Sequence, residues 1–169
     1  QTLFEKVTLN AGLRIQNHKV YGTIWIPAGG VTWKFTDNLT WKFSASKGFR
    51  SPTIRELFVW NHNMNLNPET VINYETGVLL KLLNKKVSLE ITGFAVNGDN
   101  LIVTVPLQGL QNAGEVSNKG LEFSGSAEPA KNLTVDMTYS YTQMKMPVYA
   151  TPRHNLYAGI NYNPGKFRI

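Results

Sequence analysis

The chain has 169 residues, 42% of them hydrophobic, and a formal net charge of +6. The lack of cysteine excludes disulfides, zinc–thiolate centres and cysteine nucleophiles. The sequence contains no run of about 18 apolar residues, so no transmembrane helix is predicted. The 17 lysines and arginines are scattered, with Lys85 and Lys86 as the only adjacent pair, which is typical of solvated turns, so no nucleic-acid partner is expected.

Residues 6–16 open the chain with an alternation of apolar and polar side chains. Successive side chains of a strand point to opposite faces, so this segment has one apolar and one polar face. The same pattern recurs and predicts eight strands, over residues 6–16, 28–36, 39–49, 71–83, 86–97, 114–127, 132–142 and 154–163. A ninth strand is expected to begin at Lys166. Most of these strands have the length, about 9–11 residues, that a tilted strand needs to cross a bilayer.

The predicted connections alternate between long and short. The long ones cover residues 18–27, 50–70, 98–111 and 143–153, and the short ones cover residues 37–38, 84–85, 128–131 and 163–165. Outer-membrane barrels have short periplasmic turns and long extracellular loops. The alternation therefore predicts an all-β fold, an antiparallel transmembrane β-barrel fragment with about eight strands of a larger barrel.

Aromatic residues gather beside the first short turn. Trp33 and Phe35 precede this turn, and Trp41 and Phe43 follow it, which indicates an interfacial girdle at one membrane boundary. Cross-strand aromatic pairs also occur in the core of a soluble β-sandwich, so that fold remains an alternative on pattern alone. A complete small barrel of about eight strands is a second alternative.

A sequence motif follows the third predicted strand, where residues 46–58 read SKGFRSPTIRELF. Ser51 can cap a short helix, Pro52 suits its first turn, and Glu56 is near enough to pair with Arg50 or Arg55. This stretch resembles the top of a barrel strand in TonB-dependent receptors. Further motifs follow in that family's order: Pro68-Glu69, Glu75-Thr76-Gly77, Thr92-Gly93-Phe94, Asn112-Ala113-Gly114, Lys119-Gly120-Leu121-Glu122 and Pro152-Arg153-His154.

The resemblance covers nearly the whole chain and implies a barrel of roughly 22 strands around an N-terminal plug. Residues 1–169 are then expected to form a partial outer-membrane barrel domain, with the plug domain and the last strands absent. The implied function is TonB-dependent import of a scarce nutrient, such as a ferric siderophore, haem or cobalamin, across the outer membrane of a Gram-negative bacterium. A metal chelate or vitamin fits the motifs better than a glycan. The alternative is a small outer-membrane or soluble β-barrel with a binding or structural role.

The expected partners also follow from the resemblance. They are the TonB complex, contacted through the absent plug domain, a small-molecule nutrient and outer-membrane lipid. A surface lipoprotein is a further candidate.

The connection at residues 50–70 is the main candidate for ligand contact, because long structured loops are often functional. With one residue from the connection at 143–153, the candidates are Arg50, Arg55, Trp60, His62, Asn63, Met64, Asn65 and Tyr149. Imidazole and thioether groups suit haem iron or copper. Met64 stands where the family usually has proline, and no second ligand is evident, so no metal site or cofactor is predicted.

Charged residues on the polar strand faces are expected to face the plug and its water. A Lys or Arg on the lipid side would be unfavourable by about 2–4 kcal/mol at the membrane midplane. The lumen candidates are Lys42, Glu75, Lys81, Glu90 and Asp136. The histidines fall in or beside different loops and no catalytic arrangement emerges, so the protein is not expected to be an enzyme.

Overall fold

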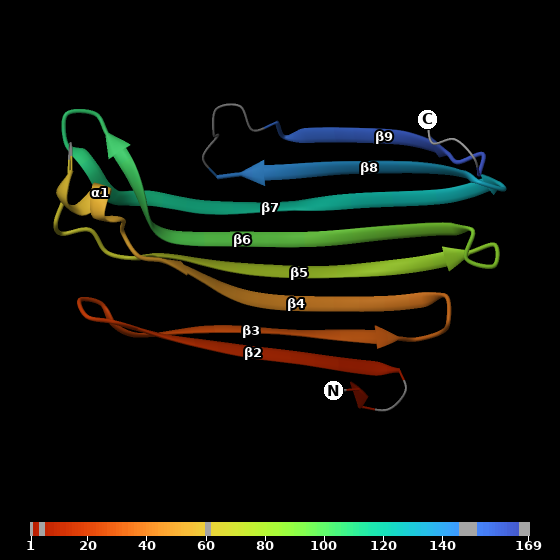
Figure 1. Ribbon diagram of the computed structural model, residues 1–169, viewed down its shortest axis with the longest axis horizontal. Helices are drawn as coiled ribbons and strands as arrows, with labels where there is room; N and C mark the ends of the chain where they lie inside the picture. Colours follow the sequence, from red (N-terminus) through yellow and green to blue (C-terminus); the bar gives the residue numbers. More distant parts are fainter. Residues whose placement is uncertain (1, 4–5, 60–61, 146–151, 166–169) are drawn as a thin grey trace.

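The computed structural model describes residues 2–3, 6–59, 62–145 and 152–165, whose strands form one antiparallel sheet in chain order (Figure 1). The strands are β1 (Thr2–Leu3), β2 (Val7–His18), β3 (Gly22–Lys34), β4 (Leu39–Arg50), β5 (Glu69–Leu82), β6 (Val87–Val105), β7 (Gly109–Ala130), β8 (Leu133–Met144) and β9 (His154–Tyr162). A short helix, α1 (Ile54–Phe58), lies between β4 and β5. No helix within the described residues is long and apolar enough to cross a membrane.

All eight predicted strands are confirmed, as β2 to β9, and each pairs with its neighbour in the chain. The two-residue β1 was not predicted. The ninth strand expected at Lys166 lies outside the described residues. The short turns between β3 and β4, β5 and β6, and β7 and β8 are confirmed, and Leu83, Asn84 and Lys85 take positive φ angles in the second of them.

The register divides the sheet into two chemically different faces, because residues paired across neighbouring strands point to the same side. One row across β3 to β9 is apolar throughout: Trp33, Trp41, Val78, Ile91, Phe123, Tyr139 and Leu156. The adjacent row, on the opposite face, is polar or glycine throughout: Thr32, Lys42, Gly77, Thr92, Glu122, Ser140 and Asn155. The alternation read from the sequence is therefore present across the sheet.

None of the described residues forms a protein layer on the apolar face. Leu13 and Ile91 are 55% and 51% exposed, and Phe43 and Val135 on the same face are also exposed. Among the described residues, Leu66 and Met144 are the only buried hydrophobic side chains. A soluble β-sandwich buries such a face in a core about 10 Å thick, and the described residues contain no such core.

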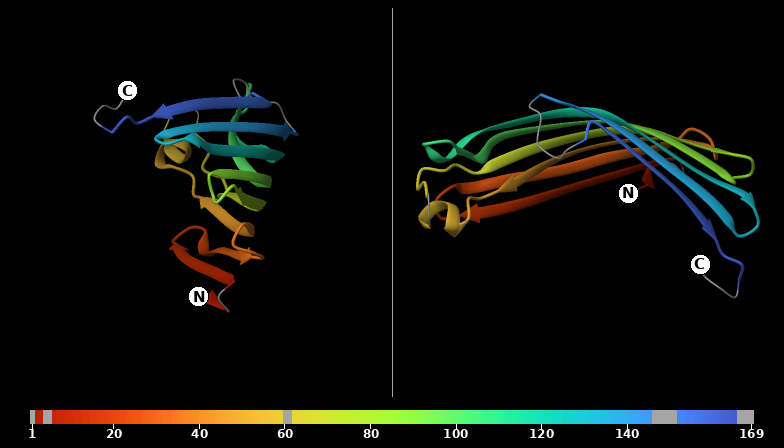
Figure 2. Two further views of the ribbon diagram at one scale, coloured as in Figure 1. Left: turned by 90° about the vertical axis from the view of Figure 1, so that its right-hand side faces the viewer. Right: turned by 90° about the horizontal axis from the view of Figure 1, so that it is seen from above.

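The sheet is strongly curved, and α1 lies on its concave side (Figure 2). Arg50 belongs to the polar face of β4, and its guanidinium binds Glu56 of α1. The polar face is therefore the concave side and the apolar face the convex side. In a closed barrel these sides face the lumen and the lipid, respectively.

Two of the predicted long connections are wrong. The connection predicted over residues 18–27 is a tight turn over residues 19–21, because His18 pairs directly with Gly22, whose φ of 73° suits such a turn. β3 then continues through Pro27, which precedes the segment of β3 that pairs with β4, so its missing N–H removes no bond to that strand.

Residues 98–111 are also not an open loop. β6 continues to Val105 and β7 begins at Gly109, with register shifts between Gly98 and Ile102. The β-branched and aliphatic run Leu101–Val105 favours an extended hairpin over a loop. Long connections remain between β4 and β5 and between β8 and β9.

The cap of α1 differs from the prediction by two residues. Thr53, not Ser51, is the N-cap, and its hydroxyl accepts a hydrogen bond from the Glu56 amide. The Glu56 carboxylate in turn accepts from the Thr53 amide at 2.7 Å. This reciprocal capping box requires the Thr-x-x-Glu spacing, which Ser51 does not offer.

Candidate functional site

The end of the sheet that carries α1 and the β6–β7 turn, called the loop end below, is organised by Arg50. Its guanidinium binds the Glu56 carboxylate at 3.0 Å and also binds Glu69 at the start of β5. The other Glu69 oxygen accepts from the Ile102 amide at 2.8 Å. Arg50 thus links β4, α1, β5 and the β6–β7 hairpin. The hydrogen bonds from Arg50 hold the pKa of Glu56 at about 2, so this carboxylate is ionised at neutral pH.

The segment after α1 is fixed onto the β6–β7 hairpin by amide side chains. Asn112 accepts from the Asn67 amide at 2.6 Å, and its side-chain nitrogen donates to the Asn67 carbonyl at 2.9 Å and the Asn100 carbonyl at 2.6 Å. Asn63 donates to the Leu110 carbonyl at 2.9 Å. Leu66 between these anchors is 2% exposed, and its carbonyl accepts from the Tyr21 hydroxyl at 2.9 Å.

A polar pocket of about 470 Å³ lies between this segment and the hairpin tip. Its lining consists of amide side chains and one imidazole: His62, Asn63, Asn65, Asn67, Gln108, Gln111 and Asn112. No carboxylate, lysine or arginine is among these lining residues. The pocket therefore offers many hydrogen-bond donors and acceptors without a carboxylate or a permanent cation.

The structure brings three of the predicted ligand residues, His62, Asn63 and Asn65, together in this pocket. Arg50 lies elsewhere, in its ion pairs, and the exposed Arg55 and Met64 do not line the pocket. Trp60 and Tyr149 lie outside the described residues. Among the residues that the structure describes, no cluster of three or more His, Cys, Asp or Glu side chains could hold a metal ion.

Sequence reasoning missed Gln108, Gln111 and Asn112 as pocket residues. It assigned residues 98–111 to a loop with no predicted conformation, so nothing placed them opposite the 62–67 segment. The motif Asn112-Ala113-Gly114 was the only sequence signal at this place.

The concave face carries the five charged residues that were expected to face the lumen: Lys42, Glu75, Lys81, Glu90 and Asp136. Lys42 on β4 reaches across β5 to Glu90 on β6, with 2.8 Å between the ammonium and the carboxylate. Gly77 lies between them on β5, and a Cβ there would come within 2.7 Å of the Thr92 hydroxyl. The missing side chain leaves the path for this cross-strand ion pair.

The comparisons with known proteins agree with this architecture. The family model described as "TonB dependent receptor-like, beta-barrel" matches residues 1–169. An uncharacterised TonB-dependent receptor of Haemophilus influenzae is 28% identical over 153 residues, which are 82% of this chain and 43% of that protein.

Solved structures show the same fold. The siderophore receptor PirA of Pseudomonas aeruginosa has a TM-score of 0.83 and 21% identity, over 97% of this chain and 32% of that one. The alcaligin outer-membrane receptor FauA of Bordetella pertussis has a TM-score of 0.70 and 18% identity, over 99% of this chain and 33% of that one. The chain thus spans less than half of each of these proteins. With its two-faced curved sheet and the family match over its whole length, the chain belongs to the TonB-dependent receptors and forms part of their β-barrel.

Proposed function

We propose that the chain is part of an outer-membrane receptor that imports a scarce nutrient, such as a ferric siderophore, haem or cobalamin, into a Gram-negative bacterium. The observation that carries this proposal is the curved sheet with a polar concave face, an apolar convex face and no core between layers. Such a sheet suits a wall between an aqueous lumen and lipid. Relatives described as siderophore receptors support an iron chelate as the ligand.

The polar pocket at the loop end is the proposed place of first ligand contact. Both long connections, β4–β5 and β8–β9, lie at the loop end, and the connections at the opposite end are short, which supports the loop end as the extracellular one. The imidazole of His62 and the amide groups of Asn63, Asn65 and the facing hairpin suit an uncharged, hydrogen-bonding part of a nutrient molecule. In this proposal Arg50 orders the loop end beside the pocket, because Glu56 and Glu69 both bind its guanidinium.

The concave face is proposed to surround a plug domain that lies outside this sequence. The Lys42–Glu90 pair and the nearby Glu75 would then lie against the plug and its water, with Lys81 and Asp136 on the same face. In this proposal the plug contacts the periplasmic TonB complex, whose pull lets the ligand pass.

Uptake measurements test the proposal with the full-length receptor in strains with and without TonB. Radiolabelled ferric siderophores, haemin and cyanocobalamin serve as probes. Uptake of at least one probe should require TonB. Deleting residues 62–65 should lower that uptake by about tenfold or more, because it removes three pocket side chains, each able to make a hydrogen bond.

The same deletion removes the Asn63 anchor but no residue of β4, α1 or β5. The amount of receptor in the outer membrane should therefore stay unchanged and serves as the control. Uptake that is equal without TonB, or a protein recovered in buffer without detergent, would contradict the proposed function.

A further inference from the structure

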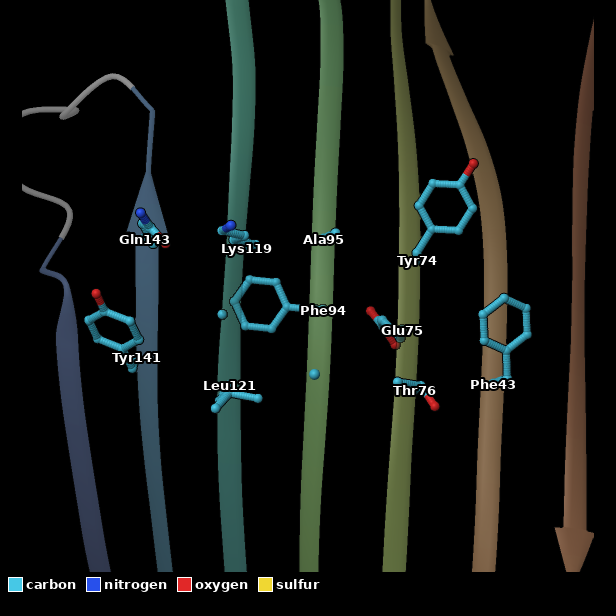
Figure 3. Close-up of a pocket in the computed structure, with 12 residues that line it drawn as sticks. Phe43, Tyr74, Glu75, Thr76, Phe94, Ala95, Lys119, Leu121, Tyr141 and Gln143 are labelled. Atoms are coloured by element: carbon cyan, nitrogen blue, oxygen red, sulfur yellow. The ribbon is translucent and has the colours of Figure 1, made fainter.

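A groove of about 500 Å³ crosses the convex face over strands β4 to β8 (Figure 3). Its floor is formed by two small residues of β6, Gly93 and Ala95, which pair with larger residues on β5 and β7. Aromatic and aliphatic side chains stand on both sides of this floor: Phe43, Tyr74, Leu121 and Tyr141. The lining of the groove is mostly apolar, which suits a hydrocarbon chain.

Missing side-chain bulk, not a missing segment, creates the groove. A Cβ built on Gly93 would have only ordinary contacts, 3.6 Å from Leu121 Cδ2 and 4.0 Å from the Thr76 carbonyl. The site is local to five neighbouring strands. It therefore does not depend on the remaining strands of the receptor or on a plug, both of which lie elsewhere around the barrel or inside it.

Lys119 marks the depth of the groove in the membrane. On the convex face of β7, apolar or glycine residues run from Ala127 to Leu121 and end at Lys119, about 26 Å along the strand. At a strand tilt of about 35–45°, this length corresponds to about 20 Å along the membrane normal, close to an apolar band about 25 Å tall. The apolar runs of β4, β6 and β8 end in the same way, at Lys47, Asn97 and Gln143. Lys119 therefore lies at the headgroup boundary of the outer leaflet.

The ammonium group of Lys119 has no acidic partner within the described part of the chain. The neighbouring cation Lys145 is paired with Glu115 at 3.0 Å, whereas Lys119 is exposed and makes no ion pair. Glu75 also borders the groove, but its side chain belongs to the concave face by register. An unpaired cation at the outer end of an apolar groove is complementary to a lipid with an acyl chain and an anionic headgroup.

We propose that this groove binds an acyl chain of a phosphorylated glycolipid of the outer leaflet, lipid A, and that Lys119 donates a hydrogen bond to its phosphate. The inference rests on the proposed outer-membrane location, and it assigns a second site, distinct from the pocket for the imported nutrient. The bound acyl chain would fill the space above Gly93 and Ala95, which the neighbouring side chains leave open toward the bilayer.

Native mass spectrometry of the full-length receptor, delipidated in detergent, tests this proposal. The protein is titrated with purified lipid A and, separately, with phosphatidylethanolamine, which has acyl chains but no net charge. Gly93→Leu fills the groove, Lys119→Gln removes the charge, and Lys86→Gln, in the turn at the opposite boundary, is the matched control.

Lipid A should remain bound to the wild type and to K86Q. Its apparent affinity should fall about tenfold in K119Q, the ratio expected for one lost charge-assisted hydrogen bond, and specific binding should be absent in G93L. Equal binding of lipid A by all four proteins, or equal binding of both lipids by the wild type, would overturn the proposal. So would a changed oligomeric state of G93L with unchanged lipid binding, because a second copy would then occupy the groove.

Nutrient uptake by the same variants separates this proposal from the proposed function. Normal TonB-dependent uptake with no lipid A binding would reject only the lipid site. A wild-type protein that needs no detergent would reject the membrane location on which both depend.

Discussion

Asn112 shows how much of the loop end depends on one side chain. Its amide both donates and accepts, and it bonds the two backbone groups of Asn67 as well as the Asn100 carbonyl. Asparagine is suited to this role because its short side chain carries a carbonyl acceptor and an NH₂ group with two donors, as three bonds of this kind require. Asn112 therefore determines where the 62–67 segment, which forms the pocket wall opposite the hairpin, is held.

Asn112→Ala should release the 62–67 segment without unfolding the barrel. It removes three hydrogen bonds, each of which contributes about 0.5–1.5 kcal/mol. Hydrogen exchange at the Asn67 amide should accelerate by about tenfold or more. Asn65→Ala is the control, because no hydrogen bond of the Asn65 side chain is present in the described structure. In the N65A variant the Asn67 amide should stay protected from exchange. Unchanged protection in N112A would show that other contacts hold the segment.

At the scale of elements, the strands could be predicted from the sequence and the ends of the hairpins could not. In segments such as residues 39–49, the alternation of apolar and polar residues predicts both the strand and the face to which each side chain points. It does so because the two faces of the strand meet different environments. The extension of β6 and β7 beyond the apolar band meets water on both sides, so Leu101–Val105 carries no alternation that separates a strand from a loop. Its partner strand decides the conformation.

The candidate site was predictable only in part for the same reason. His62, Asn63 and Asn65 stand out as polar residues of one long connection. Gln108 and Gln111 become their neighbours only through a hairpin whose register contains two shifts, and such irregularities leave no local signal in the sequence. At Gly120, in contrast, the structure shows a packing reason for a small residue.

Gly120→Ala should destabilise the sheet, whereas Gly93→Ala should not. A Cβ at Gly120 would overlap the Tyr141 carbonyl and come within 2.6 Å of the Phe94 ring, but a Cβ at Gly93 meets only ordinary contacts. Overpacking of this kind is unfavourable by about 1–3 kcal/mol. Urea unfolding of the full-length receptor in detergent should show a lower midpoint for G120A and the wild-type midpoint for G93A. Equal midpoints would mean that the strands shift to accept the added methyl group.

For the molecule as a whole, the central feature is that its two faces contact different media. No described residue covers the convex row through Trp41, Ile91 and Tyr139, and the concave face carries the Lys42–Glu90 ion pair. In water such a sheet would expose a large apolar surface that monomeric soluble proteins rarely tolerate. In a membrane the same surface is matched to hydrocarbon, so stability of this sheet requires lipid on one side.

One pair of arginine substitutions tests this claim most directly. Ile91 lies on the convex face and Ser124 on the concave face of the adjacent strand, opposite Glu90. In the full-length receptor, Ile91→Arg should strongly reduce the heat-modifiable, folded barrel recovered from the outer membrane, because arginine near the midplane is unfavourable by about 2–4 kcal/mol. Ser124→Arg, which places the same side chain toward the lumen and near a carboxylate, should assemble as the wild type does. Equal assembly of both variants would contradict the assignment of the convex face to lipid.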